Sequence, residues 1–209
     1  MLRISVSDLD SYRYYKANEE MTLQDILSRL RREEPPSPSM LAGRALHCAL
    51  EDAQWEDEQL WIDRDGFRFH FICDAALTVS AVRELKGEMP IDTPSGPVTL
   101  VGVVDAIGDD VTDYKLTGRF EAERFADSYQ WRCYLMMFGM NRFVYKVFVG
   151  AEDSSGTGFD GKPFAEWLIR EYHEMPVYRY PGMEQDVKRE VAEFAAFLRQ
   201  YGFEQRKAA

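Results

Sequence analysis

The chain has 209 residues, of which 36 are acidic and 25 are basic, so its formal net charge is −11. This charge argues against a protein that coats nucleic acid over a broad basic surface, because phosphate binding needs clustered lysine and arginine, although a local basic groove stays compatible with it. The length suits one compact domain, no apolar run is long enough to span a membrane, and three scattered cysteines indicate a reducing cytoplasm without an iron–sulfur cluster.

The first part of the chain predicts three helices. Ser7 and Asp10 have the spacing of a capping box, so a short helix is expected to start at Ser7. Thr22 is the expected cap of a second helix, which carries an apolar stripe at helical spacing. The prolines of "EEPPSPS" end that segment, and a third helix is predicted over Ser39–Gln54.

The rest of the chain predicts a mainly antiparallel sheet with further helices. Strands are expected at 67–77, 78–85, 97–107, 111–117 and 142–150, helices at 121–139, 163–173 and 183–202, and loops at 86–97 and 151–162. This order predicts an α/β sandwich in a single domain, 1–209. Its parts are an N-terminal helical part (1–38), a core (39–150) and a C-terminal helical part (151–209).

Charged residues gather on a predicted hairpin, "VGVVDAIGDDVTDYKLTG". If residues 108–110 form the turn, Asp105 lies opposite Asp113, and Lys115 projects from the same face because side chains alternate along a strand. Facing carboxylates repel each other, and a divalent cation with oxygen ligands would remove that cost. The lysine could stabilise developing charge or help deprotonate a water. Taken alone, the hairpin is equally consistent with a surface Asp–Lys pair.

The same segment resembles the signature of the PD-(D/E)xK nuclease superfamily, in the branch of RecB-type nuclease domains and phage exonucleases. That signature has a strand ending in G-x-x-D, a turn, and a strand ending in D-Y-K-T. Five residues match it, and Leu116 replaces the usual threonine; the matching residues are Gly102, Asp105, Asp113, Tyr114 and Lys115.

Two helical motifs extend the resemblance on either side of the hairpin. "GRALHCALE" resembles an upstream G-x-x-x-H-x-x-x-E pattern, in which His47 would be a metal ligand and Glu51 a ligand, a positioning group or a surface acid. "DSYQWRCYLMMFG" resembles a downstream Q-x-x-x-Y helix. Gln130 could there bind the DNA backbone, orient water or merely cap a neighbouring strand. Tyr134 could contact phosphate or Lys115, although buried tyrosines are usually core residues.

The resemblance implies a restriction-endonuclease-like core, with a mixed central β-sheet flanked by helices, and Mg²⁺-dependent hydrolysis of DNA. Asp105, Asp113 and His47 would hold Mg²⁺ or Mn²⁺, and the catalytic set would comprise Asp105, Asp113, Lys115, Glu51, Gln130 and Tyr134. The closest type is a phage or prophage exonuclease for recombination or end resection. The alternatives are a structure-specific or restriction-like endonuclease and a catalytically silent DNA-binding module.

The expected partners follow from this assignment. Duplex DNA ends are the expected substrate, with a single-strand annealing protein and a homo-oligomer as family expectations, in the cytoplasm of a bacterium or phage-infected host. Arg119, Arg124 and Arg132 follow the hairpin closely, so they are the best candidates for a local phosphate-binding rim on an acidic protein.

Overall fold

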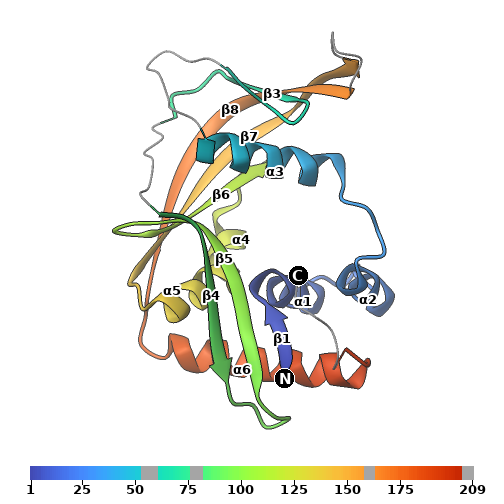
Figure 1. The fold of residues 1–209 in the computed structure, drawn as a ribbon, viewed down its shortest axis with the longest axis vertical. Coiled ribbons are helices and arrows are strands. Elements are labelled where there is room, and N and C mark those ends of the chain that lie inside the picture. Colours follow the sequence, from blue (N-terminus) through green and yellow to red (C-terminus); the bar gives the residue numbers. More distant parts are fainter. Residues whose placement is uncertain (53–60, 76–81, 158–162, 204–209) are drawn as a thin grey trace.

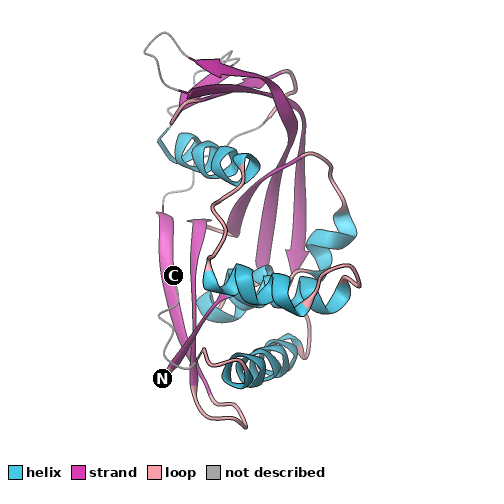
Figure 2. Ribbon diagram, turned by 90° about the vertical axis from the view of Figure 1, so that its right-hand side faces the viewer, coloured by secondary structure: helices cyan, strands magenta, loops and turns pink. Residues whose placement is uncertain are grey.

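A mixed, eight-stranded β-sheet forms the centre of a single α/β domain (Figures 1 and 2). The computed structural model describes residues 1–52, 61–75, 82–157 and 163–203. The strands are β1 (Leu2–Ser5), β2 (Trp61–Arg64), β3 (Phe67–Phe71), β4 (Val82–Ile91), β5 (Val98–Ile107), β6 (Val111–Thr117), β7 (Arg142–Thr157) and β8 (Pro163–Tyr178). They are ordered β1-β5-β6-β7-β8-β3-β2, and β4 pairs with the remaining edge of β5.

Helices flank this sheet, and α6 lies across the lower part of Figure 1 while α3 lies beside the upper part of the sheet. The helices are α1 (Val6–Ala17), α2 (Leu23–Arg31), α3 (Pro38–Asp52), α4 (Ala122–Asp127), α5 (Gln130–Phe138) and α6 (Met183–Gln200). Among the described residues, no helix is long and apolar enough to cross a membrane.

Two hydrophobic clusters meet at the central strands. The first cluster packs α1, α2, α5 and α6 against β1, β5 and β7. The second packs α3 against β2, β3 and β8. Neighbouring residues of β7 belong to different clusters, since Val147 is in the first and Phe148 in the second. Successive strand residues point to opposite faces, so at this place the clusters cover the two sides of the sheet.

One edge of β5 is divided between two partners, and this division positions the candidate site. β4 pairs along all of β5 on one edge, from Val82↔Ile107 to Ile91↔Val98. On the other edge, β1 pairs with residues 98–101, and β6 pairs only with residues 106 and 107. Between those two partners, at residues 102–105, no strand of the described ranges pairs with this edge. β6 leaves β5 at this gap and continues along β7 in parallel.

Several local predictions are confirmed. Thr22 caps α2 through a capping box with Asp25. The turn at 108–110 closes the β5–β6 hairpin, with Gly108 N donating to Asp110 O at 3.0 Å. The apolar face of α3 is buried as expected, and α6 matches the predicted C-terminal helix. The first helix is capped by Ser5, whose hydroxyl accepts from Asp8 N, and the prediction of Ser7 as its cap was wrong.

The prediction of a helical C-terminal part was wrong for residues 151–157 and 163–178. Residues 151–157 continue β7, and 163–178 form β8 instead of a loop and a helix. The two long strands form an antiparallel ribbon that satisfies their backbone groups along most of their length. Likewise, residues 86–91 belong to β4 and not to a loop, because they pair with β5 up to Ile91↔Val98. The predicted strand residues 76–81 lie outside the described residues.

The predicted helix at 121–139 is divided into α4 and α5. Ser128, between them, is extended (φ −56°, ψ 140°). Asp10 accepts hydrogen bonds there from Ser128 Oγ at 2.8 Å and from Tyr129 N at 2.9 Å. The first N–H groups of a helix have no acceptor within that helix, and the Asp10 carboxylate accepts one of them at the start of α5. In a continuous helix this N–H group would bond to a carbonyl of the preceding turn.

Candidate active site

The candidate site lies where β5 and β6 separate. Hydrogen-bonded pairing of the hairpin ends at Ala106↔Thr112, so Asp105 and Asp113 are not paired across it as the sequence suggested. Instead, the Asp105 carboxylate bridges the opening, and its Oδ2 accepts a hydrogen bond from Tyr114 N at 2.8 Å. The side chain thus satisfies a backbone donor that an unbroken hairpin would have satisfied with a carbonyl group.

Asp113 is the most buried acid of this site, with a side chain only 4% exposed. Its Oδ1 accepts from Gln130 Nε2 at 2.5 Å, and its Oδ2 lies 2.6 Å from Lys115 Nζ. Burial, together with the nearby charge of Asp105, raises the pKa of Asp113 to about 6 despite the attraction of Lys115 and His47. Burial removes much of the hydration of a carboxylate, and a neighbouring carboxylate repels it. Both effects disfavour the charged form.

His47 reaches the site from α3. Its Nδ1 lies 3.4 Å from Asp105 Oδ2, and a quarter of the side chain (26%) is exposed. Burial lowers the pKa of His47, but the hydrogen bond and charge of Asp105 outweigh that effect, so the pKa is raised overall. The same contact lowers the pKa of Asp105 in spite of its burial. When His47 is protonated, its imidazolium and the Asp105 carboxylate therefore stabilise each other as an ion pair.

Lys115 carries the second positive charge of the site. Burial lowers the pKa of its ammonium, but the charges of Asp113 and Asp105 raise it by more, so the pKa is raised overall. The ammonium is therefore firmly protonated in this arrangement. A charged ammonium can stabilise negative charge on a phosphate, whereas proton abstraction from water requires the neutral amine.

A cavity of about 530 Å³ opens beside these groups. It is lined by His47, Asp105 and Lys115, and also by two charged residues that sequence reasoning did not assign, Arg44 and Glu84. Glu84 has a left-handed backbone (φ 48°). It is not paired with β5, although its neighbours on both sides are, at Arg83↔Ala106 and Leu85↔Val104. A non-glycine residue in this conformation is uncommon in a strand and is often found at functional sites. No sequence pattern marked it.

Tyr134 packs against β5 at the gap, where its ring lies over Gly102. Its hydroxyl donates to Val103 O at 2.7 Å, and the residue is 4% exposed. A Cβ atom at Gly102 would lie 2.5 Å from Tyr134 Cε1, so glycine is required for this close approach. These contacts fit the structural role that the sequence left open as an alternative, and the assignment of Tyr134 to the catalytic set stays a prediction.

The remaining predicted residues are placed as follows. Glu51 lies in the last turn of α3, and its side chain lies outside the described residues. Arg119 is exposed and pairs with Glu121 at 3.2 Å. Arg132 packs over the Trp131 ring at 4.3 Å and donates to backbone carbonyls at the end of α4, which is a structural arrangement. Arg124 lines a different cavity.

The donor chemistry suits a hard divalent cation, because two carboxylates and an imidazole converge on one opening. In the described part of the chain, however, no three His, Cys, Asp or Glu side chains are already grouped as metal ligands. His47 and Lys115 instead balance the carboxylates one by one. Binding of a cation would therefore require these ion pairs to separate.

Comparison with solved structures shows the fold alone. The structure described as "Crystal structure of SSO0001" superposes with a TM-score of 0.51 and 12% sequence identity, covering 94% of this chain and 77% of that one. A scan of protein-family models gives no match to the chain, and a search of curated proteins gives none. The superposition supports the mixed α/β architecture and says nothing of activity at this level of identity.

Proposed function

We propose that the protein is a metal-dependent deoxyribonuclease with a restriction-endonuclease-like core, and that it acts as an exonuclease on duplex ends. The observation that carries this proposal is the opened β5–β6 hairpin. It brings Asp105, Lys115 and His47 to one cavity, and buried Asp113 lies next to them, with its Oδ2 2.6 Å from Lys115 Nζ. Carboxylates whose pKa is raised by burial and a neighbouring acid, as that of Asp113 is, are concentrated at functional sites, which favours an enzyme over a catalytically silent module.

Each side chain has a distinct task in this proposal. Asp105, Asp113 and His47 would hold Mg²⁺ or Mn²⁺, which when bound polarises the phosphate and lowers the pKa of water. Lys115, released from Asp113, would place its ammonium against the phosphate and stabilise negative charge there. Gln130 donates to Asp113 Oδ1 and thereby fixes the orientation of that carboxylate.

End-labelled linear duplex and covalently closed circular DNA, each incubated with Mg²⁺, test this proposal. We expect wild-type protein to release label from the linear duplex and to leave the circle intact. Nicking of the circle would identify an endonuclease with the same site. Asp113→Asn is the matched control, because it keeps the shape of the side chain and removes its charge. Cleavage by that variant at the wild-type rate would disprove the assignment of the site.

A further inference from the structure

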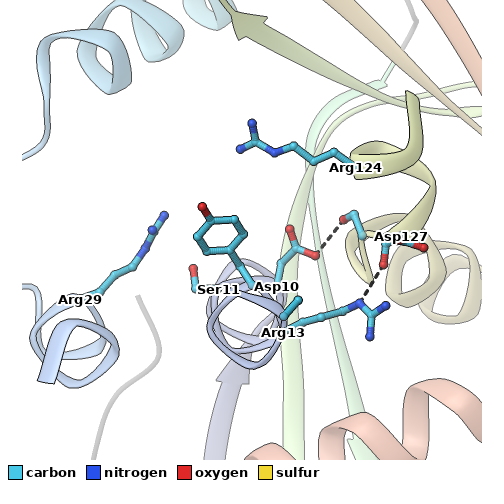
Figure 3. Close-up of a pocket in the computed structure, with 9 residues that line it drawn as sticks. Asp10, Ser11, Arg13, Arg29, Arg124 and Asp127 are labelled. Atoms are coloured by element: carbon cyan, nitrogen blue, oxygen red, sulfur yellow. Dashed lines mark hydrogen bonds between the residues drawn. The ribbon is translucent and has the colours of Figure 1, made fainter. Parts of the chain in front are cut away.

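A second cavity, of about 420 Å³, lies between α1, α2 and α4 (Figure 3). It is lined by Arg13, Arg29 and Arg124, and also by Asp10 and Asp127. These five side chains carry a net charge of +1, in a protein whose formal charge is −11. A positive cavity on an acidic protein is a place where an anion would be attracted against the overall repulsion of the surface.

Two of the arginines have no charged partner in the part of the chain that the structure describes. Among the described residues, neither Arg29 nor Arg124 makes a side-chain hydrogen bond or ion pair, and both are exposed. Figure 3 shows their guanidinium groups reaching into the same open space from α2 and α4. Two other charged groups of this wall have partners: Arg13 Nε donates to the backbone oxygen of Asp127 at 3.0 Å, and Asp10 accepts from Ser128 Oγ and Tyr129 N. Unpaired guanidinium groups that converge on one space are a typical arrangement for a phosphate.

The cavity is connected to the candidate active site by hydrogen bonds. Asp10 in the cavity wall accepts a hydrogen bond from Ser128 Oγ at 2.8 Å. Ser128 Oγ in turn accepts a hydrogen bond from Gln130 N at 3.1 Å. Gln130 then donates to Asp113 with its side chain. The charge of Asp10 is also among those that act on Lys115. A chain of hydrogen bonds through Ser128 and Gln130 therefore links the wall of this cavity with Asp113 of the candidate site.

We propose that this cavity binds a phosphate group of a nucleic-acid strand through Arg29 and Arg124. Tyr14, which is 49% exposed and also lines the cavity, offers a ring face to the attached sugar or base. The inference rests on the proposed nuclease function for its choice of ligand, since it places a strand that enters the active site against α1, α2 and α4. The phosphate is either a terminal monoester or an internal diester, and these share the recognition chemistry.

Fluorescence anisotropy of labelled oligonucleotides in EDTA tests the proposal without cleavage. The probes are identical strands with a 5′-phosphate, a 3′-phosphate or hydroxyl ends. We expect the double variant Arg29→Gln/Arg124→Gln to bind at least about tenfold more weakly and to lower the slope of log affinity against log salt by about 1 to 2. Weaker binding of every probe indicates an internal diester, and weaker binding of only one phosphorylated probe indicates that terminal group.

Arg31→Gln is the matched control, because Arg31 lies on the same helix and its guanidinium lies over the Phe203 ring at 5.7 Å. The control should bind like wild type. Equal affinity of the double variant and wild type, or the same loss in Arg31→Gln, would overturn the proposal, as would wild-type protein that binds none of the probes. Wild-type cleavage of linear duplex is measured separately. Binding through the arginines without any cleavage would count against the nuclease proposal only.

Discussion

Replacing Asp113 with asparagine is expected to stabilise the fold while it abolishes the proposed activity. Asparagine keeps the oxygen that accepts from Gln130 and mimics the protonated carboxyl group. The pKa of Asp113 is raised from 3.8 to about 6, so the folded protein holds a proton on this group that the unfolded chain releases at lower pH. The negative charge that Asp113 carries above this range therefore costs folding free energy, which asparagine would remove.

The size and the pH window of this effect follow from the shift. A rise of about two pKa units corresponds to roughly 3 kcal/mol of folding free energy. Between about pH 4 and pH 6 the native state binds more protons here than the unfolded state, so wild-type stability falls as pH rises through this window. Asp113→Asn should gain about 1 to 3 kcal/mol at about pH 8, and the gain should vanish near pH 4.

Urea unfolding in EDTA, at several pH values across that window, measures this difference. Asp105→Asn is the control of opposite sign. The pKa of Asp105 is lowered, so its charge stabilises the fold above its unfolded pKa of 3.8, and its loss should destabilise at neutral pH. A variant Asp113→Asn that is less stable than wild type at about pH 8, or whose gain is the same at all pH values, would refute the electrostatic reasoning.

Three further predictions concern the neighbours of Asp113. His47→Ala should weaken Mn²⁺ binding in titration calorimetry by at least about tenfold, and unchanged affinity would make the histidine structural. Lys115→Ala should reduce cleavage of linear duplex by at least about 100-fold. Lys115→Arg should retain measurable turnover, because arginine keeps the positive charge. An equal loss of activity in both variants would favour a role of Lys115 in proton transfer instead. Gly102→Ala should lower the midpoint of urea unfolding by displacing Tyr134, and the double variant Gly102→Ala/Tyr134→Phe should not restore it, because the clash is with the ring. Full recovery in that double variant would place the problem at the hydroxyl.

The features that the sequence predicted correctly are local ones. Thr22 and Asp25 lie within one turn of a helix, and the turn at 108–110 is set by its own residues, so neither depends on distant partners. The convergence of His47 with Asp105 came from the resemblance, and the geometry agrees with it at 3.4 Å.

The features that were missed depend on pairing between distant segments. Residues 163–178 contain several good helix formers, yet they form a strand because they pair with β7 on one edge and with β3 on the other. The gap in β5 arises because β1 and β6 occupy the same edge, which no window of the sequence contains. Glu84 lines the cavity and has a left-handed backbone conformation, which interrupts the regular alternation of side chains along β4. A strand pattern in the sequence therefore could not predict on which face its side chain lies.

The meeting of two hydrophobic clusters at β6 and β7 has a consequence for cooperativity. His47 belongs to the helix that packs in the second cluster, and Gln130 begins a helix of the first. Both contact aspartates at the opening of the hairpin. A ligand bound there would link two units that could otherwise open separately, and amide hydrogen exchange in α3 and α5 would slow together when it binds. A ligand at the opened hairpin would therefore couple the unfolding of the two hydrophobic clusters.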